Sequence, residues 1–140
     1  MPSVELIAGN PIVVAARESG ANGYAAGDLV QFDSNGYVAV GATTSFCAIA
    51  RKTEGAVANV ACEIEMINPY NLYSLASAGT LAQTDVGDGF VVTFTEGAQY
   101  GTVGTDSDGV IVGLLDPIGT VGGRWIVQFW DSVCKTGLIG

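Results

Sequence analysis

Carboxylates are the strongest candidates for chemistry in this chain of 140 residues, because it contains no histidine. Catalytic triads that use an imidazole base and metal sites with histidine ligands are therefore excluded. Glu63 and Glu65 lie two residues apart, which on a strand places both side chains on one face. Such a pair more often solvates the outside of a strand than acts as the acid and base of a glycosidase. The sequence predicts no catalytic residue and no enzyme.

Two stretches rich in Asp and Gly, "DVGDG" (85–89) and "TDSDG" (105–109), faintly resemble calcium-binding loops. The EF-hand pattern fails in the second, because counting from Asp106 puts Ile111 where glycine is required and Pro117 where glutamate is required. Asp and Gly also favour turns for reasons of backbone conformation alone. Both stretches are interpreted as turns, and neither a metal nor another cofactor is predicted.

The three cysteines, Cys47, Cys62 and Cys134, are an odd number and show no Cys-x-x-Cys spacing. This pattern disfavours a disulfide framework and a zinc site. Free thiols in a protein made in a reducing cytoplasm are the expected state.

The elements that carry these residues are short apolar runs separated by Gly, Asn, Asp or Pro. This pattern predicts an all-β protein with a β-sandwich or barrel-like fold. One stretch, residues 68–79, is left open between a short helix that starts near Asn68 and an extended linker. The expected strands are 4–8, 11–16, 28–33, 37–41, 46–51, 60–67, 90–95, 98–103, 109–115 and 124–131.

An internal repeat is suggested by two similar stretches, "AGDLVQFDSNGYVAV" (26–40) and "VGDGFVVTFTEGAQYGTV" (86–103). The two candidate units are residues 24–67 and 86–130. An offset of 62 residues aligns their first strands, and an offset of 63 aligns the rest. The alternative is a chance self-alignment of a chain rich in Gly and Val. The aligned pairs are Gly27 with Gly89, Val30 with Val92, Phe32 with Phe94, Tyr37 with Tyr100, Val40 with Val103, Ile49 with Val112 and Ile64 with Val127.

Charge is sparse and acidic. Charged residues make up 14% of the chain, against about 25% in a typical soluble domain. The net charge of −9 opposes nucleic-acid binding, which needs a cationic surface. No apolar run approaches the roughly 18 residues that suggest a membrane span. A small chain with so few charges is expected to bury part of its surface against protein partners.

Domain organisation follows from these patterns. Residues 1–20 are expected to form an N-terminal extended arm or the first strands, residues 21–131 one compact β domain, and residues 132–140 a C-terminal tail. An arm could add a strand to a neighbour's sheet. Trp130 is a further candidate, because tryptophan is enriched at interface hot spots. The predicted interface residues are Val4, Leu6, Ile12, Val14 and Trp130.

Residues 24–67 resemble the capsid decoration, or cement, proteins of tailed bacteriophages. Those proteins often combine an Ala-Gly-Asp-x-Val start, a Gly-x-Val turn and strand, an Ala- and Thr-rich loop, and an apolar strand followed by a Gly-containing turn. The apolar strand of the family often reads Ile-Gly-Val-Ala, and "CAIAR" departs from it. The matching positions here are Ala26, Gly27, Asp28, Val30, Gly36, Val38, residues 42–44, residues 48–50 and Gly55.

The resemblance implies a structural virion protein, commonly a homotrimer, on the outer capsid surface. It would be made in the host cytoplasm and would tie major capsid proteins together, with no membrane and no nucleic acid among its partners. The alternative is a β-sandwich module that binds a glycan or another ligand, with Tyr70, Tyr73 and Trp130 as exposed stacking platforms.

Overall fold

The structure, a computed structural model, describes residues 3–20, 23–41, 46–53, 55, 57–95, 98–104 and 108–130. It is all-β, as the sequence predicts. Within these ranges it holds one short 3-10 helix, η1 (Gln83–Asp85), and eleven strands. In chain order the strands are β1 (Val4–Ala8), β2 (Ile12–Arg17), β3 (Leu29–Phe32), β4 (Val38–Val40), β5 (Ala48–Ala50), β6 (Ala61–Met66), β7 (Leu72–Ala76), β8 (Gly89–Thr95), β9 (Ala98–Val103), β10 (Gly109–Leu114) and β11 (Arg124–Phe129).

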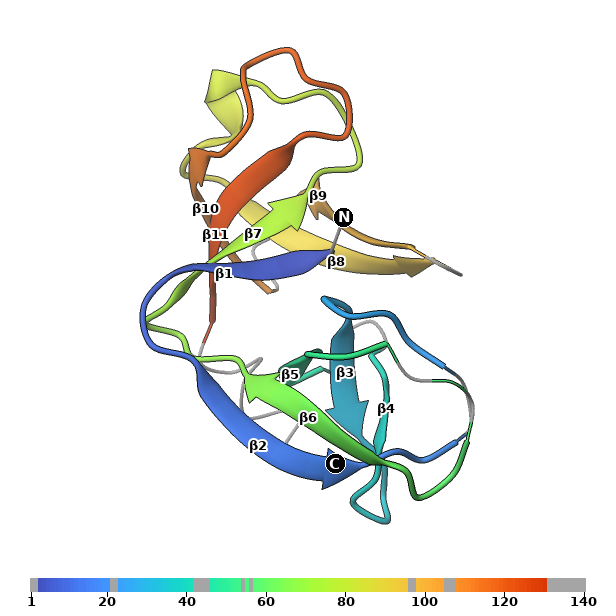
Figure 1. The fold of residues 1–140 in the computed structure, drawn as a ribbon. Helices are drawn as coiled ribbons and strands as arrows, with labels where there is room; N and C mark the ends of the chain where they lie inside the picture. The colour runs from blue at the N-terminus through green and yellow to red at the C-terminus, as the bar shows by residue number, and fades with distance from the viewer. Residues whose placement is uncertain are drawn as a thin grey trace.

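The strands form two antiparallel sheets, one above the other in Figure 1. The upper sheet has the order β1-β7-β11-β10-β8-β9, and the lower one β2-β6-β5-β3-β4. We call β2–β6 the N-terminal unit and β7–β11 the C-terminal unit. The order of strands across the two units is the same: β2 corresponds to β7, β6 to β11, β5 to β10, β3 to β8 and β4 to β9. The two units therefore share one topology, and β1 is an extra strand on the edge of β7.

Each sheet curls until its first and last strands meet. In the N-terminal unit a parallel bridge joins Glu18, just after β2, to Val38 of β4. In the C-terminal unit the corresponding bridge joins Ser77, just after β7, to Gly101 of β9. The next residue in each case, Ser19 or Ala78, donates its N–H to the carbonyl of the same partner. Both units are thus small barrel-like sheets, and the chain passes between the two sheets from β1 to β2 and from β6 to β7.

The hydrogen bonds fix which residues are equivalent. The N–H of Gly27 bonds to the carbonyl of Ala50, as the N–H of Gly87 does to that of Ile111. Both glycines have a positive φ, 90° and 94°, a conformation that side chains disfavour. Gly27 therefore corresponds to Gly87 rather than to Gly89.

The repeat register predicted from sequence is thus wrong by two residues in the first strand. The same holds for β5, whose Ile49 corresponds to Val110 and not to Val112. The other pairs keep the predicted offset of 63, for example Ile64 with Val127. A slip of two residues keeps every side chain on the same face of a strand, so apolar alternation cannot distinguish the two registers.

The stretch 68–79 contains neither a helix nor a linker. It contains β7, which lies between β1 and β11 in the centre of the upper sheet. Asn68 does not cap a helix: its side chain accepts the N–H of Tyr70 at 2.9 Å, and its carbonyl accepts the N–H of Asn71, which makes a turn. Tertiary pairing overrides the local helix signals here, because two neighbouring strands satisfy the backbone of β7.

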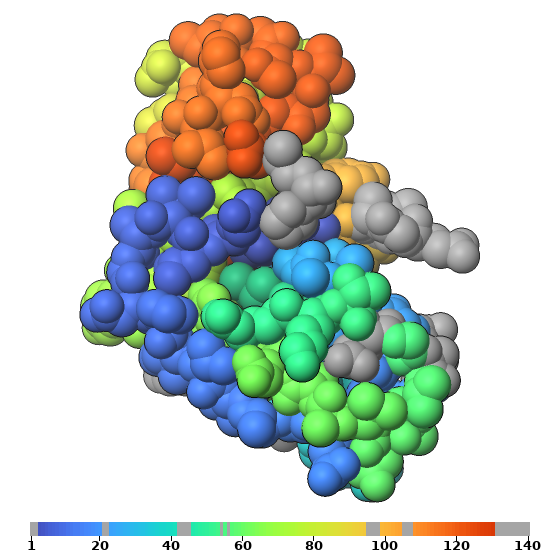
Figure 2. All heavy atoms as spheres, in the orientation of Figure 1, coloured from blue at the N-terminus to red at the C-terminus, as the bar shows by residue number. Residues whose placement is uncertain are grey.

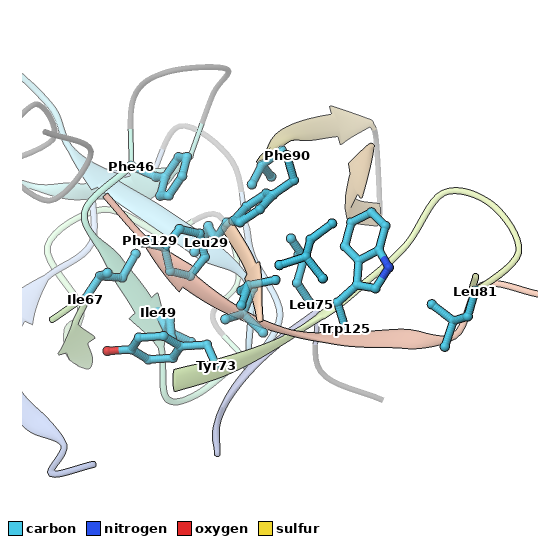
Figure 3. Close-up of a cluster of buried hydrophobic side chains, with 14 residues drawn as sticks. Leu29, Phe46, Ile49, Ile67, Tyr73, Leu75, Leu81, Phe90, Trp125 and Phe129 are labelled. Carbon is cyan, nitrogen blue, oxygen red and sulfur yellow. The ribbon is translucent and has the colours of Figure 1, made fainter. Parts of the chain in front are cut away.

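The larger core fills the C-terminal unit and extends to the inner face of the N-terminal one. Phe129 is its centre: its ring lies 5.7 Å from that of Phe46, 5.6 Å from Tyr73 and 5.6 Å from Phe90, all edge to face. Figure 3 shows these rings together with Leu29 and Ile49, which come from the lower sheet. Edge-to-face contacts add to the stabilisation from burial. This shared core holds the two sheets together.

A smaller core fills the N-terminal unit. Its buried side chains are mostly small or β-branched, with Tyr24 the largest. The free thiols of Cys47 and Cys62 are part of it and behave as small hydrophobic groups. The complete buried set is Tyr24, Val30, Val38, Cys47, Ala48, Ala50, Cys62 and Ile64.

Two strands lie within residues 3–20. β1 pairs with β7, and β2 pairs with β6 over its whole length, both antiparallel and within the same chain. The predicted C-terminal tail lies outside the described residues.

Candidate functional site

The edge of β2 is the most unusual surface of the described chain. β2 is the first strand of its sheet and pairs along its length with β6. Its C-terminal end meets β4 at the Glu18–Val38 bridge, and before that point no described strand pairs with its other edge. Ile12, Val13 and Val14 are 46%, 44% and 39% exposed, although they alternate between the two faces of the strand. Figure 1 shows β2 along the lower left border of the molecule, and in Figure 2 the blue atoms of this segment lie on the outer surface.

The backbone of β2 can be oriented from its C-terminal end. Glu18 donates its N–H to Val60 and accepts the N–H of Asn59, so its polar groups face β6. Ser19 donates to Val38 on the opposite side. Backbone groups alternate along an antiparallel strand. The N–H and C=O groups of Val13 and Ala15 therefore point to the open edge, away from β6, whereas those of Arg17 face the end of β4.

In the C-terminal unit, the strand edge that corresponds to the open edge of β2 is covered by another strand. Val14 corresponds to Tyr73, because each pairs with the equivalent residue of the next strand. β1 runs antiparallel along β7, with Leu6 opposite Tyr73 and Glu5 opposite Ser74. Tyr73 is completely buried, whereas Val14 is exposed. Tyr73 packs against Phe129 in the larger core and has β1 beside its strand, whereas no described strand pairs with β2 at Val14.

A shallow groove continues the open edge. It has a volume of about 430 Å³ and lies between the end of β2 and the β3–β4 hairpin. Its lining is nearly uncharged, with Arg17 as the single ionisable cation and Tyr37 as the aromatic group. The lining residues are Ala15, Ala16, Arg17, Asn35, Gly36, Tyr37 and Ala61.

A second hollow, of about 230 Å³, lies between β1 and the N-terminal unit and carries charge. Arg51 approaches Glu65 at 3.5 Å and Glu63 at 4.0 Å. Burial raises the pKa of Glu65 and Arg51 partly offsets this. One Glu65 carboxylate oxygen, Oε2, has no hydrogen-bond partner among the described residues. The hollow is small and open, and its charges are largely paired with each other, so it does not form an acid-base site.

An apolar loop lies at the far end of the C-terminal unit, between β10 and β11 (Figure 2, orange, top). Ile118 is 63% exposed and Val121 is 80% exposed. The base of the loop is fixed by Arg124, whose guanidinium donates to both carboxylate oxygens of Asp116 at 2.8 and 3.0 Å. These bonds lower the pKa of Asp116 to about 2. The loop thus presents apolar side chains from a fixed base.

Asp108 is a deeply buried carboxylate with a structural contact. Asp108 accepts the N–H of Val92 at 2.7 Å, and burial raises its pKa although this hydrogen bond opposes the shift. Its equivalent in the N-terminal unit is Cys47, whose pKa burial raises to about 11 and the Phe32 N–H opposes. Both positions hold a side chain against the backbone of the neighbouring hairpin strand. Neither faces a cavity with a second reactive group.

Among the described residues no group of three or more Cys, Asp or Glu side chains is placed to hold a metal ion. Glu63 and Glu65 share a strand with Arg51 beside them, not a cleft. Of the calcium-like stretches, residues 85–89 run from the end of η1 to the start of β8, while residues 105–107 lie outside the described ranges. The described part of the chain can bind through its surfaces, and shows no arrangement for acid-base chemistry.

The predicted interface residues lie in different environments. Ile12 and Val14 lie at the open edge of β2. Val4 is buried in the larger core of its own chain, and Leu6 packs against that core. Trp130 is half-buried and donates its backbone N–H to the carbonyl of Asp108.

The aromatic platform expected for a glycan-binding module is not assembled. Tyr70 is 88% exposed, but Tyr73 is completely buried and its hydroxyl accepts the N–H of Asn68 at 2.9 Å. Trp130 is only partly accessible. Tyr73 therefore cannot stack on a sugar.

Comparison with protein-family models, with curated proteins and with solved structures finds no match for this chain. Within the described ranges no helix is long and apolar enough to cross a membrane.

Sequence reasoning missed Val13 and Ala15, whose backbone groups face the open edge. It selected Ile12 and Val14 by alternation, which identifies a face of a strand. Nothing in the alternation of β2 distinguishes an edge strand from a paired one. The short length of the apolar run and the small Ala15 and Ala16 were the available signals.

Proposed function

We propose that this protein is a capsid decoration protein of a tailed bacteriophage. It attaches to the outer surface of the head and stabilises contacts between major capsid proteins. The single observation that carries the proposal is the pair of exposed apolar surfaces, the β2 edge and the β10–β11 loop, on opposite units of a charge-poor chain. A protein with two such surfaces is suited to bridging.

Three further properties support this proposal. The sequence pattern of residues 24–67 resembles that family. The net charge of −9 keeps the protein away from packaged DNA, which repels it. The described residues offer surfaces for binding and no cluster of metal-binding side chains, which suits a protein that acts by binding other proteins. Association with the shell, and with further copies of itself, would bury the apolar groups that the isolated chain exposes.

Sedimentation with undecorated phage heads tests the proposal. The purified chain is mixed with heads that lack decoration protein and centrifuged, and the pellet is assayed for bound chain at a series of concentrations. Saturable binding at a fixed number of copies per head is expected. A chain that stays in the supernatant with heads of every phage tested, at concentrations above 100 µM, would contradict the proposal.

Two variants identify the surface that attaches. The double substitution Ile118→Asp with Val121→Asp places charges on the β10–β11 loop, where the side chains already face solvent. Val57→Asp is the matched control, because Val57 is 59% exposed in a different loop. Loss of head binding in the double variant alone assigns attachment to the loop. Loss in neither variant assigns it elsewhere.

A further inference from the structure

We propose that a hollow in the C-terminal unit binds an arginine side chain of a partner protein. The hollow has a volume of about 290 Å³ and lies between the end of β7 and β9. Trp125, Asp85, Thr80 and Thr102 are among the residues that line it. In assigning this arginine to the protein that the β10–β11 loop meets, the inference rests on the proposed function. The binding site itself is testable with the purified chain.

Comparison of the two units shows how the hollow arises. Ser77 and Gly101 form a bridge that corresponds to the bridge between Glu18 and Val38 in the N-terminal unit. The two larger side chains of the N-terminal unit are completely buried at this place. In the C-terminal unit the ring of Trp125 takes part of the space, because a Cβ on Gly101 would lie 2.7 Å from it. The small Ser77 side chain leaves the rest of the space open to solvent.

Asp85 gives the hollow a fixed acceptor. Its Oδ2 atom accepts the N–H of Ala82 at 3.1 Å and the indole N–H of Trp125 at 3.3 Å. Figure 3 shows the Trp125 ring at one side of the larger core, with its nitrogen turned away from Phe129. The other carboxylate oxygen, Oδ1, accepts no hydrogen bond from a described residue. The carboxylate is therefore held in place with one oxygen available to a ligand.

The charges of the C-terminal unit favour a cation in the hollow. Arg124 is the only basic residue in the described part of this unit, and its guanidinium is paired with Asp116. Asp85 and Asp88 have no ion-pair partner among the described residues. The net charge of the chain is −9, which adds to the attraction of a positive group. A cation must therefore come from outside this unit.

The hydrogen-bonding groups of the hollow favour a guanidinium over an ammonium. Thr80 and Thr102 are exposed, and neither hydroxyl bonds to a described residue. Together with Asp85 they line the hollow with several acceptors beside an aromatic ring. A guanidinium carries more N–H donors than an ammonium, holds them in a planar fork, and is less strongly hydrated next to aromatic side chains. These properties match the lining, so arginine is the expected ligand.

The position of the hollow indicates that the arginine belongs to a protein. Thr80 forms an antiparallel bridge with Val121, and Gly79 accepts the N–H of Gly122 at 2.8 Å, so the hollow borders the exposed β10–β11 loop. The aliphatic stem of an arginine can cover apolar groups such as Val121 while its guanidinium reaches Asp85. A single exposed ion pair contributes little by itself. The arginine is therefore one contact of a surface that also includes the apolar loop.

Tryptophan fluorescence of the purified chain is the primary experiment. In a Trp130→Phe background Trp125 is the only tryptophan, and it reports on the hollow. Titration with N-acetyl-arginine amide at low salt should give a weak, saturable change that is lost at high salt. The neutral citrulline derivative should give no change, and the lysine derivative should bind more weakly. A citrulline response equal to that of arginine overturns the role of charge, and lysine binding as tight as that of arginine overturns the choice of a guanidinium.

A matched pair of variants locates the site. Asp85→Asn keeps an oxygen acceptor for the N–H groups of Ala82 and Trp125 but removes the charge, and it should weaken binding of the arginine probe by about fivefold. Asp88→Asn makes the same charge change at an exposed residue that does not line the hollow, and it should leave binding unchanged. Urea denaturation checks that both variants are folded. Equal binding by Asp85→Asn and the wild type, or equal weakening in both variants, overturns the inferred site.

Sedimentation with undecorated phage heads then tests the partner. Asp85→Asn should weaken head binding, and Asp88→Asn should not. Binding of the arginine probe by a chain that binds no heads would reject the proposed function and keep the site. Head binding that Asp85→Asn leaves unchanged would keep the proposed function and overturn the assignment of this arginine to the capsid.

Discussion

Val14 and Tyr73 occupy the same position in two units of one topology, yet one is exposed and the other is completely buried. Their strands have the same neighbour on one side, β6 or β11. On the other side β7 has β1, and β2 has no described strand. The comparison shows that the exterior of this protein is set by which edges are covered as well as by which residues are apolar.

The interiors of the two units also differ, in the size of the side chains at equivalent positions. Large aromatic side chains fill the C-terminal unit where smaller ones fill the N-terminal unit. Trp125 stands where Cys62 does, and Phe129 where Met66 does. Gly109 stands where Ala48 does, because a methyl group there would meet the carbonyl oxygen of Gln128. The interior of the C-terminal unit is therefore filled mainly by aromatic rings, and that of the N-terminal unit mainly by smaller side chains.

The largest expected effect comes from emptying the centre of the aromatic core. Phe129→Ala should lower the free energy of unfolding by about 3–5 kcal/mol, because the ring contacts three other buried rings. The equivalent Met66→Ala should cost only about 1–2 kcal/mol, since Met66 is partly buried. Urea denaturation measures both. Equal losses would contradict the difference between the two cores.

Gly109 and Ala48 test the same comparison with one methyl group. Gly109→Ala should lower the free energy of unfolding by about 1–3 kcal/mol, because the added Cβ would lie 2.1 Å from the Gln128 carbonyl oxygen. Ala48→Gly should cost roughly 0.5–1 kcal/mol, mainly through backbone entropy. Thermal and urea unfolding provide the values. A Gly109→Ala protein as stable as the wild type would show that the two units pack alike at this position.

Asp108 and Cys47 differ in charge at one equivalent position. Burial raises the pKa of Asp108 in the folded state, so the folded protein holds this proton more tightly than the unfolded chain. Stability from this group is therefore gained as pH falls through the raised pKa and lost as pH rises through it. Asp108→Asn keeps an oxygen acceptor for the Val92 N–H and should remove this dependence. Its stability relative to the wild type should be higher at pH 7 than at pH 4, measured by urea denaturation. An unchanged difference between the two pH values would contradict the assignment.

Asp116 should show a smaller effect of opposite sign. Its pKa of about 2, held down by Arg124, lies below the ordinary value of 3.8 in the unfolded chain. The stability from this contact is present above about pH 4 and is lost as pH falls toward 2. Asp116→Asn should flatten the stability profile over that window. The same acid loss in the variant and the wild type would assign it to other carboxylates.

Much of the fold is predictable from the sequence, because most strands are indicated by the pattern of their own residues. Short apolar runs bounded by Gly, Asn and Asp correctly indicate ten of the strands, for instance 60–67 and 124–131, because each strand carries its own pattern. β7 is different. Its five residues resemble the start of a helix, and only its two neighbouring strands make it extended.

The candidate site is less predictable, because it depends on which strand edge has no neighbouring strand. Whether Val14 is covered is decided by where β1 pairs, and β1 pairs with β7 instead of β2. Both Val4 and Ile12 begin alternating apolar segments, so the sequence pattern treats them alike. Packing then places Val4 in the core and leaves Ile12 at the surface.

Hydrogen exchange at single amides tests the central claim, that β1 completes the edge of one unit while no described strand pairs with the corresponding part of the other. The amides of Val13 and Ala15 should exchange rapidly, while those of the equivalent Leu72 and Ser74, which lie against β1, should stay protected. Equal protection of the two pairs of amides would contradict the account.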